Sequence, residues 1–370
     1  VIGGADIYKL FLESGLVGEM CSTVLEQAYD CDVFFPYYLV SNQGIYPKYT
    51  DTALTGNIKG YISHVKFRNC QEQEFLRLGS KILEMGNEKT DRTGTGTVSL
   101  FGEHLKFDLT DNTFPLITTR KMFFRGIFEE LMLYVRGLTD NNLLEEKKIS
   151  VWTPNTSREF LDKRGLHHLP TGDMGPSYGF LFRHFGAKYV DCFTDYKGQG
   201  VDQLQRVIDT IKTNPNDRRM IISLWDPSNL DNCPLPPCLY NYQFYVSEGL
   251  GNLDPKTGIL GTKRYLSCMM TQRSSDFAVA GGWNIATGAL LTILIASVTG
   301  LEPKELIWNL GDVHIYNNLR KNFAMQTDRS PYPFPKLYVS KKDKIDDFQF
   351  QDCTLVGYKS HPSIEYQMSV

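Results

Sequence analysis

Residues 236–246 read Pro-Pro-Cys-Leu-Tyr-Asn-Tyr-Gln-Phe-Tyr-Val, which joins a two-proline turn to a run rich in aromatic residues. Such a run predicts a buried β-strand, which we place at Tyr240–Val246. Because proline rings restrict the backbone, the turn would hold the sulfur of Cys238 in one place beside the start of that strand. Most cysteines are small buried hydrophobes, so a catalytic role for Cys238 depends on the groups predicted around it.

Arginines are the groups that we expect near this thiol. They precede or follow predicted strands, or lie in the glycine-containing loop 91–97, and they are Arg92, Arg218, Arg219 and Arg273. Guanidinium groups favour the thiolate, which is the reactive form of cysteine, and they bind phosphate oxygens in pairs. An adjacent arginine pair before a buried strand is costly unless an anion is present. We therefore expect a sulfur nucleophile acting on an anionic substrate, with solvated surface arginines as the alternative.

The remaining pattern mixes helices and strands in irregular order, which favours an α+β domain over a doubly wound sheet. Amphipathic or apolar periodicity predicts helices at 71–86, 126–137, 201–212 and 284–299. Apolar runs between turn residues predict strands at 98–109, 220–225, 240–246 and 266–272. The segment 247–263 is rich in Gly, Lys and Asp, and we expect a surface hairpin loop there.

Three further positions carry polar groups with possible chemical roles. His314 and Tyr316 are two residues apart, so an extended backbone would place both on one side. One carboxylate of Glu129-Glu130 should point inward from an apolar helix, and a buried carboxylate has a raised pKa and can exchange protons. Asn284 follows two glycines and a tryptophan and could cap a helix or read a planar base edge. Each position also has a purely structural interpretation, as a core or surface side chain.

Bulk composition limits the other possibilities. The 370 residues include 39 Lys plus Arg and 42 Asp plus Glu, so a formal charge of −3 gives no basic field for nucleic acid. Eight cysteines lack any C-x-x-C pair, which favours reduced thiols in a cytoplasmic protein over a disulfide framework or a metal site. The longest apolar run, 288–298, is too short for a membrane span and predicts a buried helix.

Residues 1–66 read as the end of a separate domain, because the chain opens on Val1 and not on methionine. The predicted strand Val1-Ile2, the turn Gly3-Gly4 and a helix at 6–12 together could cradle a phosphate, although a plain tight turn is the simpler interpretation. Strand ends are predicted at 32–36 and 61–67. We expect this chain to be the rear part of a longer protein.

In order along residues 70–370, these segments resemble the thymidylate synthase family. The matching motifs are Asp91–Thr97, Phe114–Thr119, Glu129–Leu131, Gly175–Phe180, Arg183–Ala187, Asp217–Arg219, Leu235–Cys238, Gln272–Asp276, Asn284–Ala286 and Gly311–Tyr316. Residues 1–66 are similar to the C-terminal part of dihydrofolate reductase, through Val1–Gly4, Ile7-Tyr8 and Asp32–Pro36. The resemblance implies domains at 1–66 and 67–370, the second being the rear half of a bifunctional enzyme whose front reductase part is absent here.

This resemblance implies a large twisted mixed sheet flanked by helices, with the sheets of two subunits stacked in a homodimer. The implied reaction is methylation of dUMP to dTMP by 5,10-methylenetetrahydrofolate, which leaves as dihydrofolate. No metal is implied, and NADPH would serve only the reductase part, with Gly3 and Gly4 as remnants of its site.

The resemblance also implies residue roles. Cys238 would add to the uracil ring in a catalytic set that includes Glu130, Arg273, Asp276 and Asn284. The dUMP-binding set would be Arg92, Gln272, Arg273, Ser274, Asn284, His314 and Tyr316, with Arg218 and Arg219 supplied by the partner subunit. Folate would contact Trp152, Asn155 and Asp276.

The chain departs from the family's pattern at three places, and two alternative functions follow. Leu239 replaces a histidine, Leu133 replaces a tryptophan, and Gly281-Gly282-Trp283 replaces a proline-containing loop that usually ends in phenylalanine before Asn284. One alternative is a dUMP hydroxymethylase of the same fold, in which water replaces hydride. The other is a weakly active, binding-only relative. A cysteine hydrolase has no support beyond the thiol.

Overall fold

The computed structural model describes residues 6–9, 19–25, 52–53, 60–66, 70–91, 94–253 and 260–367. Its first part contains a three-stranded antiparallel sheet in the order β1 (Glu19–Leu25), β3 (Gly60–Lys66) and β2 (Thr52–Ala53). The strand predicted at 61–67 is β3, and residues 6–9 of the predicted helix are helical. The predictions at Val1–Gly4 and at 32–36 lie outside the described residues.

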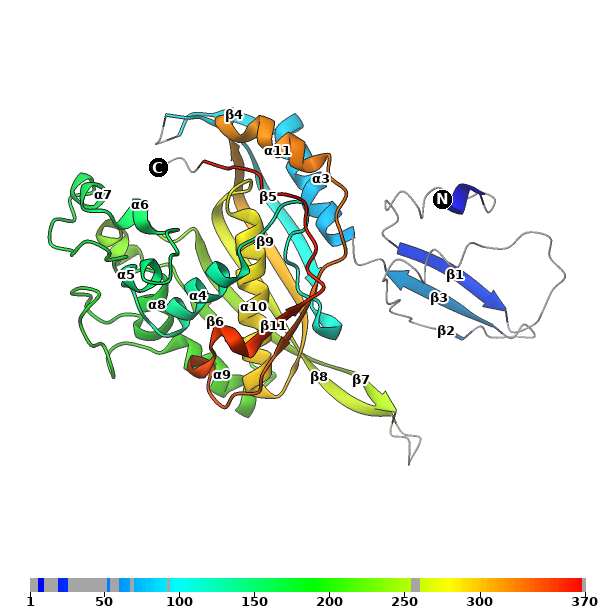
Figure 1. Ribbon diagram of the computed structural model, residues 1–370. Coiled ribbons are helices and arrows are strands. Elements are labelled where there is room, and N and C mark those ends of the chain that lie inside the picture. The colour runs from blue at the N-terminus through cyan, green and yellow to red at the C-terminus, as the bar shows by residue number, and fades with distance from the viewer. Residues whose placement is uncertain are drawn as a thin grey trace.

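A six-stranded mixed sheet forms the centre of the rest of the chain (Figure 1). Its order is β4 (Asn87–Lys89), β5 (Thr97–Asp108), β9 (Glu302–Tyr316), β8 (Leu260–Asp276), β7 (Leu239–Leu253) and β6 (Ile221–Ser223). Only β8 and β9 pair in parallel among these six strands, whereas the other neighbours are antiparallel. The α+β prediction with a large mixed sheet is therefore confirmed. A separate hairpin pairs β10 (Lys336–Val339) with β11 (Cys353–Val356).

Helices cover one face of this sheet. The central one is α10 (Gly281–Thr299), which packs on β8 and β9 and also contacts α4 (Phe124–Val135) and α9 (Gln203–Thr213) (Figure 1). On its other side α4 contacts α8 (Tyr178–His184). The helix α3 (Cys70–Met85) contacts β5, and α11 (Arg320–Thr327) contacts α3. Three short helices follow α4 in the chain: α5 (Asn142–Glu145), α6 (Thr153–Thr156) and α7 (Arg158–Lys163).

The core helix α10 begins three residues earlier than its sequence pattern suggests, at Gly281, so Asn284 is inside the helix and not its N-cap. The early start follows from close packing, because a Cβ added at Gly282 would lie 2.9 Å from the Ile117 side chain. The helix is long and apolar enough to cross a membrane, but 83% of its most apolar window is buried. It is therefore a core helix, as predicted for its central residues.

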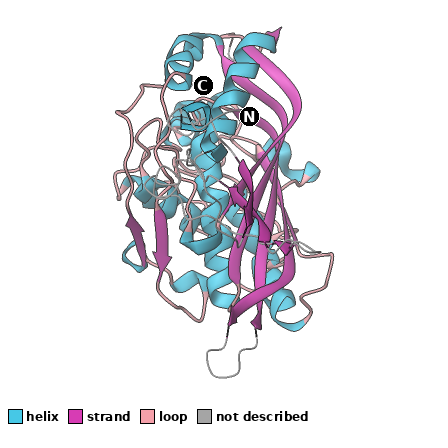
Figure 2. Cartoon of the chain, turned by 90° about the vertical axis from the view of Figure 1, so that its right-hand side faces the viewer, coloured by secondary structure: helices cyan, strands magenta, loops and turns pink. Residues whose placement is uncertain are grey.

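The strands β7 and β8 correct the prediction of a loop for residues 247–253 and 260–263, whereas 254–259 lie outside the described residues. Strand pairing continues from Ser247↔Tyr265 to Leu253↔Leu260, and both views show a two-stranded arm that extends past the rest of the sheet (Figures 1 and 2). Backbone hydrogen bonds between the strands stabilise this segment in spite of its polar and glycine-rich composition.

Candidate active site

The turn that carries Cys238 is held by the first turn of α8 and by β8. The backbone N–H of Cys238 donates to the phenol oxygen of Tyr178 at 2.9 Å, and the Cys238 carbonyl accepts the backbone N–H of Arg273 at 2.9 Å. These bonds use both backbone groups of Cys238, so its position at the start of β7 is fixed. The thiol itself is half-buried.

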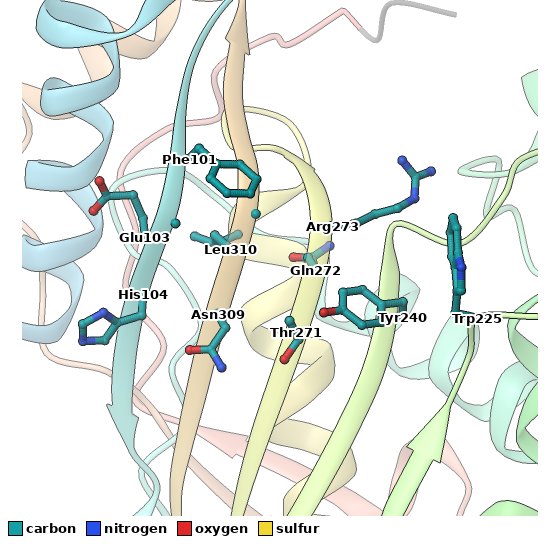
Figure 3. A pocket seen from close by; sticks show the side chains of 12 residues that line it. Phe101, Glu103, His104, Trp225, Tyr240, Thr271, Gln272, Arg273, Asn309 and Leu310 are labelled. Atoms are coloured by element: carbon teal, nitrogen blue, oxygen red, sulfur yellow. The ribbon is translucent and has the colours of Figure 1, made fainter.

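Arg273 reaches back over the same turn. Its Nε donates to the Pro237 carbonyl at 2.9 Å, its Nη2 donates to the Pro236 carbonyl at 3.1 Å, and the same Nη2 lies 3.8 Å from the sulfur of Cys238. The guanidinium also lies over the Trp225 ring, with 5.4 Å to the ring centre (Figure 3). The predicted pairing of Cys238 with Arg273 is therefore present in the structure, and a positive charge beside sulfur favours its thiolate.

The other cysteines whose side chains the structure describes differ from Cys238 in their electrostatics. Desolvation by burial raises the pKa of Cys233, Cys268 and Cys353 to about 12 in each case. Burial, followed by the nearby carboxylate of Asp173, raises the pKa of Cys192 still further. These four thiols are therefore poor nucleophiles at neutral pH, whereas Cys238 has a guanidinium next to it.

Glu130 lies across from this turn, on the buried side of α4. Its Oε1 accepts the indole N–H of Trp152 at 2.7 Å and the hydroxyl of Tyr134 at 2.9 Å, and its Oε2 accepts the indole N–H of Trp283 at 2.6 Å. Burial raises the pKa of Glu130, and the three hydrogen bonds lower it in part. Glu129 is also buried, but its carboxylate forms an ion pair with Lys147 at 2.6 Å. The prediction that one carboxylate of the pair points inward is confirmed for Glu130.

Cys238 and Glu130 share one cavity of about 260 Å³ between α4, α8, α10 and the start of β7. Its lining is mostly apolar and aromatic, as expected of a small-molecule site. The other residues around it are Tyr134, Val151, Trp152, Asn155, Tyr178, Phe182, Leu235, Leu239, Tyr242, Gln272, Val279, Ala280, Trp283, Asn284 and Thr287. Both predicted folate residues, Trp152 and Asn155, are therefore on its wall.

Asn284 and Gln272 meet at one side of the cavity. The Asn284 side-chain nitrogen donates to Gln272 Oε1 at 3.3 Å, and the same oxygen accepts the indole N–H of Trp308 at 2.6 Å. The buried amide of Gln272 is thus oriented by a donor-only indole, and it in turn orients Asn284. This orientation leaves the Asn284 oxygen available to a planar ligand, as a base-reading role requires.

Ser274, His314 and Tyr316, which are predicted to bind the nucleotide, lie where the parallel strands β8 and β9 end. Asp276 is in register with His314, and Ser274 with Asp312. His314 and Tyr316 lie on one side of β9 as predicted, with their rings 5.4 Å apart. The His314 Nδ1 lies 3.0 Å from Asp312, which also pairs with Lys89 at 3.0 Å. Burial raises the pKa of the half-buried Asp276, whose carboxylate accepts the backbone N–H of Val279 at 3.1 Å.

The adjacent arginines are away from this cavity within one chain. Arg218 and Arg219 are exposed, and Arg218 lines a hollow with Tyr245 and Met269 on the sheet face opposite the helices. The Arg219 guanidinium, 87% exposed, pairs with Asp217 at 2.7 Å, so the expected cost of burying an arginine pair does not arise. Arg92, Gly3 and Gly4 lie outside the described residues.

The sheet face without helices has its own hollow of about 580 Å³, beside Arg273 (Figure 3). Phe101 and Tyr245 project from this face with 83% and 65% of their surfaces exposed. Large aromatic side chains exposed on one sheet face are typical of an interaction surface.

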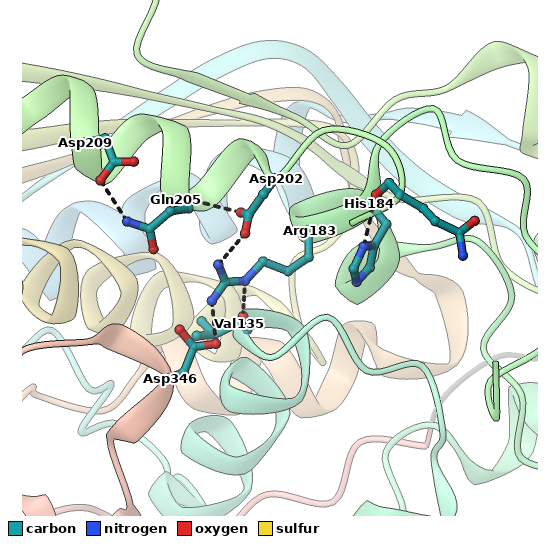
Figure 4. A network of polar contacts seen from close by, with 8 residues as sticks. Val135, Arg183, His184, Asp202, Gln205, Asp209 and Asp346 are labelled. Atoms are coloured by element: carbon teal, nitrogen blue, oxygen red, sulfur yellow. Dashed lines mark hydrogen bonds and ion pairs between the residues drawn. The ribbon is translucent and has the colours of Figure 1, made fainter. Parts of the chain in front are cut away.

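Arg183 anchors α8, the helix that carries Tyr178. Its guanidinium is buried and donates to the Val135 carbonyl at 2.6 Å and to Asp202 at 2.8 Å, and it pairs with Asp346 (Figure 4). One side chain therefore ties α8 to the end of α4, to the N-cap of α9 and to the C-terminal part of the chain.

Sequence reasoning missed two site residues. In the sequence, Tyr178 is one residue of the motif Gly175–Phe180, and Trp283 is a departure from a family pattern; neither feature indicates a contact in the site. A local pattern shows neither contact, because Trp283 and Glu130 are 153 positions apart in the sequence. An aromatic residue with a polar atom in an otherwise apolar segment is the signal that could have drawn attention to both.

Comparison with known proteins decides the family. The sequence profile described as thymidylate synthase matches residues 73–370. The chain belongs to the thymidylate synthase family. The thymidylate synthase of Saccharomyces cerevisiae is 48% identical over 82% of this chain and 98% of that protein, and the human thymidylate synthase is 46% identical over 81% and 91%. The bifunctional dihydrofolate reductase-thymidylate synthase of Leishmania major is 40% identical over 100% of this chain and 70% of that protein.

The chain is accordingly an enzyme of the thymidylate synthase family, and its activity is the methylation of dUMP with methylenetetrahydrofolate. The cavity agrees with this chemistry, because the Cys238 thiol and the Glu130 carboxylate line it among aromatic side chains. The Arg273 guanidinium lies 3.8 Å from the sulfur.

Proposed function

We propose that Cys238 is the nucleophile of this thymidylate synthase and that the residues around it act on dUMP in the following way. The thiolate adds to C6 of the uracil ring, and the electrons of the C5–C6 double bond move toward C5 and O4. C5 then attacks the one-carbon unit of the folate and loses its proton. The bond between that carbon and the folate nitrogen breaks, and hydride from the same folate adds to the transferred carbon as the thiolate leaves. The 3.8 Å approach of Arg273 to sulfur supports this assignment most directly.

The nucleotide would be held by groups on three sides. Arg273, Arg92 and the hydroxyl of Ser274 would bind the phosphate, and His314 with Tyr316 would bind the sugar hydroxyl. Asn284, oriented by Gln272, would read the uracil edge at O4 and N3. The supporting observation is that β8 and β9 run parallel and so end at the same edge, where Ser274, His314 and Tyr316 lie.

Glu130 would organise water and move protons near O4, because a buried carboxylate with a raised pKa can exchange protons near neutral pH. The folate would lie against Trp152 and Asn155, and Asp276 would accept a hydrogen bond from its pterin ring. Methylenetetrahydrofolate then supplies both the carbon and the hydride in this step.

We propose a homodimer in which the helix-free faces of two sheets stack. Phe101 and Tyr245 are exposed on that face of a single chain, and burial of such side chains favours association. Arg218 and Arg219 would cross this interface to the phosphate in the partner's site. Both side chains are exposed, Arg218 lines the hollow on that face, and neither arginine lines the Cys238 cavity, which supports a role in trans.

Residues 1–66 would be the C-terminal part of a reductase domain, with the synthase domain at 67–370. The bifunctional relatives from Leishmania major and Paramecium tetraurelia match 100% of this chain, which supports the proposal. NADPH would serve only that reductase domain. We place the protein in the cytoplasm, since the five cysteines with described side chains form no disulfide.

The test is product analysis by mass spectrometry after incubation with dUMP and methylenetetrahydrofolate. The proposal predicts dTMP and an equal amount of dihydrofolate. Hydroxymethyl-dUMP would instead identify a hydroxymethylase, and the absence of any product at saturating substrate would identify a binding-only relative.

A further inference from the structure

Trp283 contacts the carboxylate of Glu130 through one hydrogen bond. Its indole nitrogen lies 2.6 Å from Oε2 of Glu130, and it approaches from α10, opposite the helix α4 that carries Glu130. No other hydrogen bond to Oε2 is found among the described residues, whereas Oε1 has two donors. The orientation of the second carboxylate oxygen therefore depends on Trp283.

The donors around Glu130 fix the direction of these hydrogen bonds. An indole N–H can donate but cannot accept, so Trp152 on Oε1 and Trp283 on Oε2 both require a lone pair from the carboxylate. Tyr134 accepts from Trp152 at 2.9 Å and donates to Glu130, which completes the network. Three donors around a buried carboxylate favour its charged form.

The surrounding backbone makes room for the indole ring. A Cβ added at Gly126, one turn before Glu130 on α4, would lie 2.7 Å from the ring of Trp283. The absence of a side chain there lets α4 and α10 approach closely enough for the hydrogen bond. Trp283 also directly precedes Asn284, so the bond fixes the first turn of α10 at the point where the base would be read.

We propose that Trp283 is a positioning residue for the synthase reaction, whose indole N–H holds the Glu130 carboxylate in its working orientation and state of charge. The proposal rests on the proposed role of Glu130 in moving protons near the pyrimidine. It goes beyond that role, because it assigns the control of Glu130 to a side chain that need not touch either substrate.

The electrostatic consequence has a definite sign. Burial raises the pKa of Glu130, and the hydrogen bond from Trp283 is the largest of the three influences that lower it. Loss of that bond removes stabilisation of the carboxylate, so the pKa of Glu130 rises further. The other titratable groups on the cavity wall are Tyr134 on α4, Tyr178 on α8, and Cys238 and Tyr242 on or beside β7, and the cavity residues from α10 do not titrate.

The variants Trp283→Phe and Trp283→Leu separate the hydrogen bond from the packing. Both remove the N–H, but only phenylalanine keeps an aromatic ring in the space beside Gly126. If the N–H controls Glu130, both variants shift the limb of the pH–kcat profile that depends on Glu130 upward by about one pH unit. We also expect kcat at neutral pH to fall about tenfold while KM for dUMP changes less than threefold.

A spectroscopic readout follows Glu130 without any turnover. In the full chain labelled with ¹⁵N-tryptophan, the indole N–H of Trp152 reports on Oε1 of the same carboxylate. Its titration midpoint should rise by about one pH unit in Trp283→Phe. An unchanged midpoint and an unchanged pH profile would overturn the proposal, because a packing role alone moves neither.

The unmodified protein provides a test even if the variants misfold. The indole signals of Trp152 and Trp283 should titrate with one shared midpoint, and both should stop titrating in Glu130→Gln. A Trp283 indole signal whose chemical shift does not change with pH, while that of Trp152 titrates, would contradict the proposal. Failure of the wild-type chain to make dTMP would instead refute the proposed function and leave this titration result intact.

Discussion

The phenol oxygen of Tyr178 accepts the backbone N–H of Cys238 at 2.9 Å, so a side chain of α8 holds the turn that presents the thiol. In Tyr178→Phe that partly buried N–H loses its partner, which costs about 1 kcal/mol in the folded state. We expect a lower rate of turnover and a changed rate of Cys238 alkylation by iodoacetamide, measured at one pH.

Tyr338→Phe is the matched control, because Tyr338 is half exposed on β10 and away from the cavity. It should leave turnover and the alkylation rate within experimental error of the unmodified protein. Equal alkylation rates in Tyr178→Phe and in the control would show that the turn does not need the Tyr178 bond.

Arg183→Met should destabilise the protein. The change leaves the Val135 carbonyl and two carboxylates, Asp202 and Asp346, without their shared donor. We expect the free energy of unfolding to fall by about 2 kcal/mol in urea titrations. Arg77→Met, which removes an exposed pair with Glu74, should change it by less than about 0.5 kcal/mol. Equal losses in the two variants would contradict the anchoring role.

Mixing two inactive variants tests the arginines in trans. One chain carries Cys238→Ala and the other carries Arg218→Ala with Arg219→Ala. If the arginines cross the interface, each mixed dimer has one complete site, and random reassortment restores about a quarter of wild-type activity. Arginines that act within their own chain would leave every mixture inactive.

Asn284→Asp should shift the preference from dUMP toward dCMP, since a carboxylate accepts a hydrogen bond from the cytosine amino group. The change also removes the donor to Gln272 Oε1, which keeps only its bond from Trp308, so some loss of stability should accompany it. A competition assay with both nucleotides measures the preference. Unchanged selectivity would remove Asn284 from base recognition.

Local patterns predicted much of the fold because the elements around the site are strongly periodic. The strand after Cys238, the neighbouring strand with Arg273 and the helix with Glu130 all lie where the sequence suggests. Adjacent strands then bring the thiol and guanidinium together without any long-range information.

What the sequence could not predict depended on packing between distant segments. The position of Asn284 just before an apolar helical run favours an N-cap, but α10 begins at Gly281. A Cβ added at Gly281 would lie 3.1 Å from Phe75 and one added at Gly282 would lie 2.9 Å from Ile117, so glycine suits this close packing. The polar composition of 247–263 favours a loop, yet strand pairing extends β7 through Leu253 and begins β8 at Leu260. The bond from Trp283 to Glu130 joins two helices and has no local signature.

The most direct measurement is the mass of the covalent complex formed with 5-fluoro-dUMP and methylenetetrahydrofolate. A fluorine at C5 cannot leave as the proton does, so the adduct should persist and be found on the peptide that contains Cys238. We predict one molecule each of nucleotide and folate on that peptide, and none in Cys238→Ser. An adduct on another cysteine, or no adduct in the unmodified protein, would contradict the assignment of Cys238 as the nucleophile.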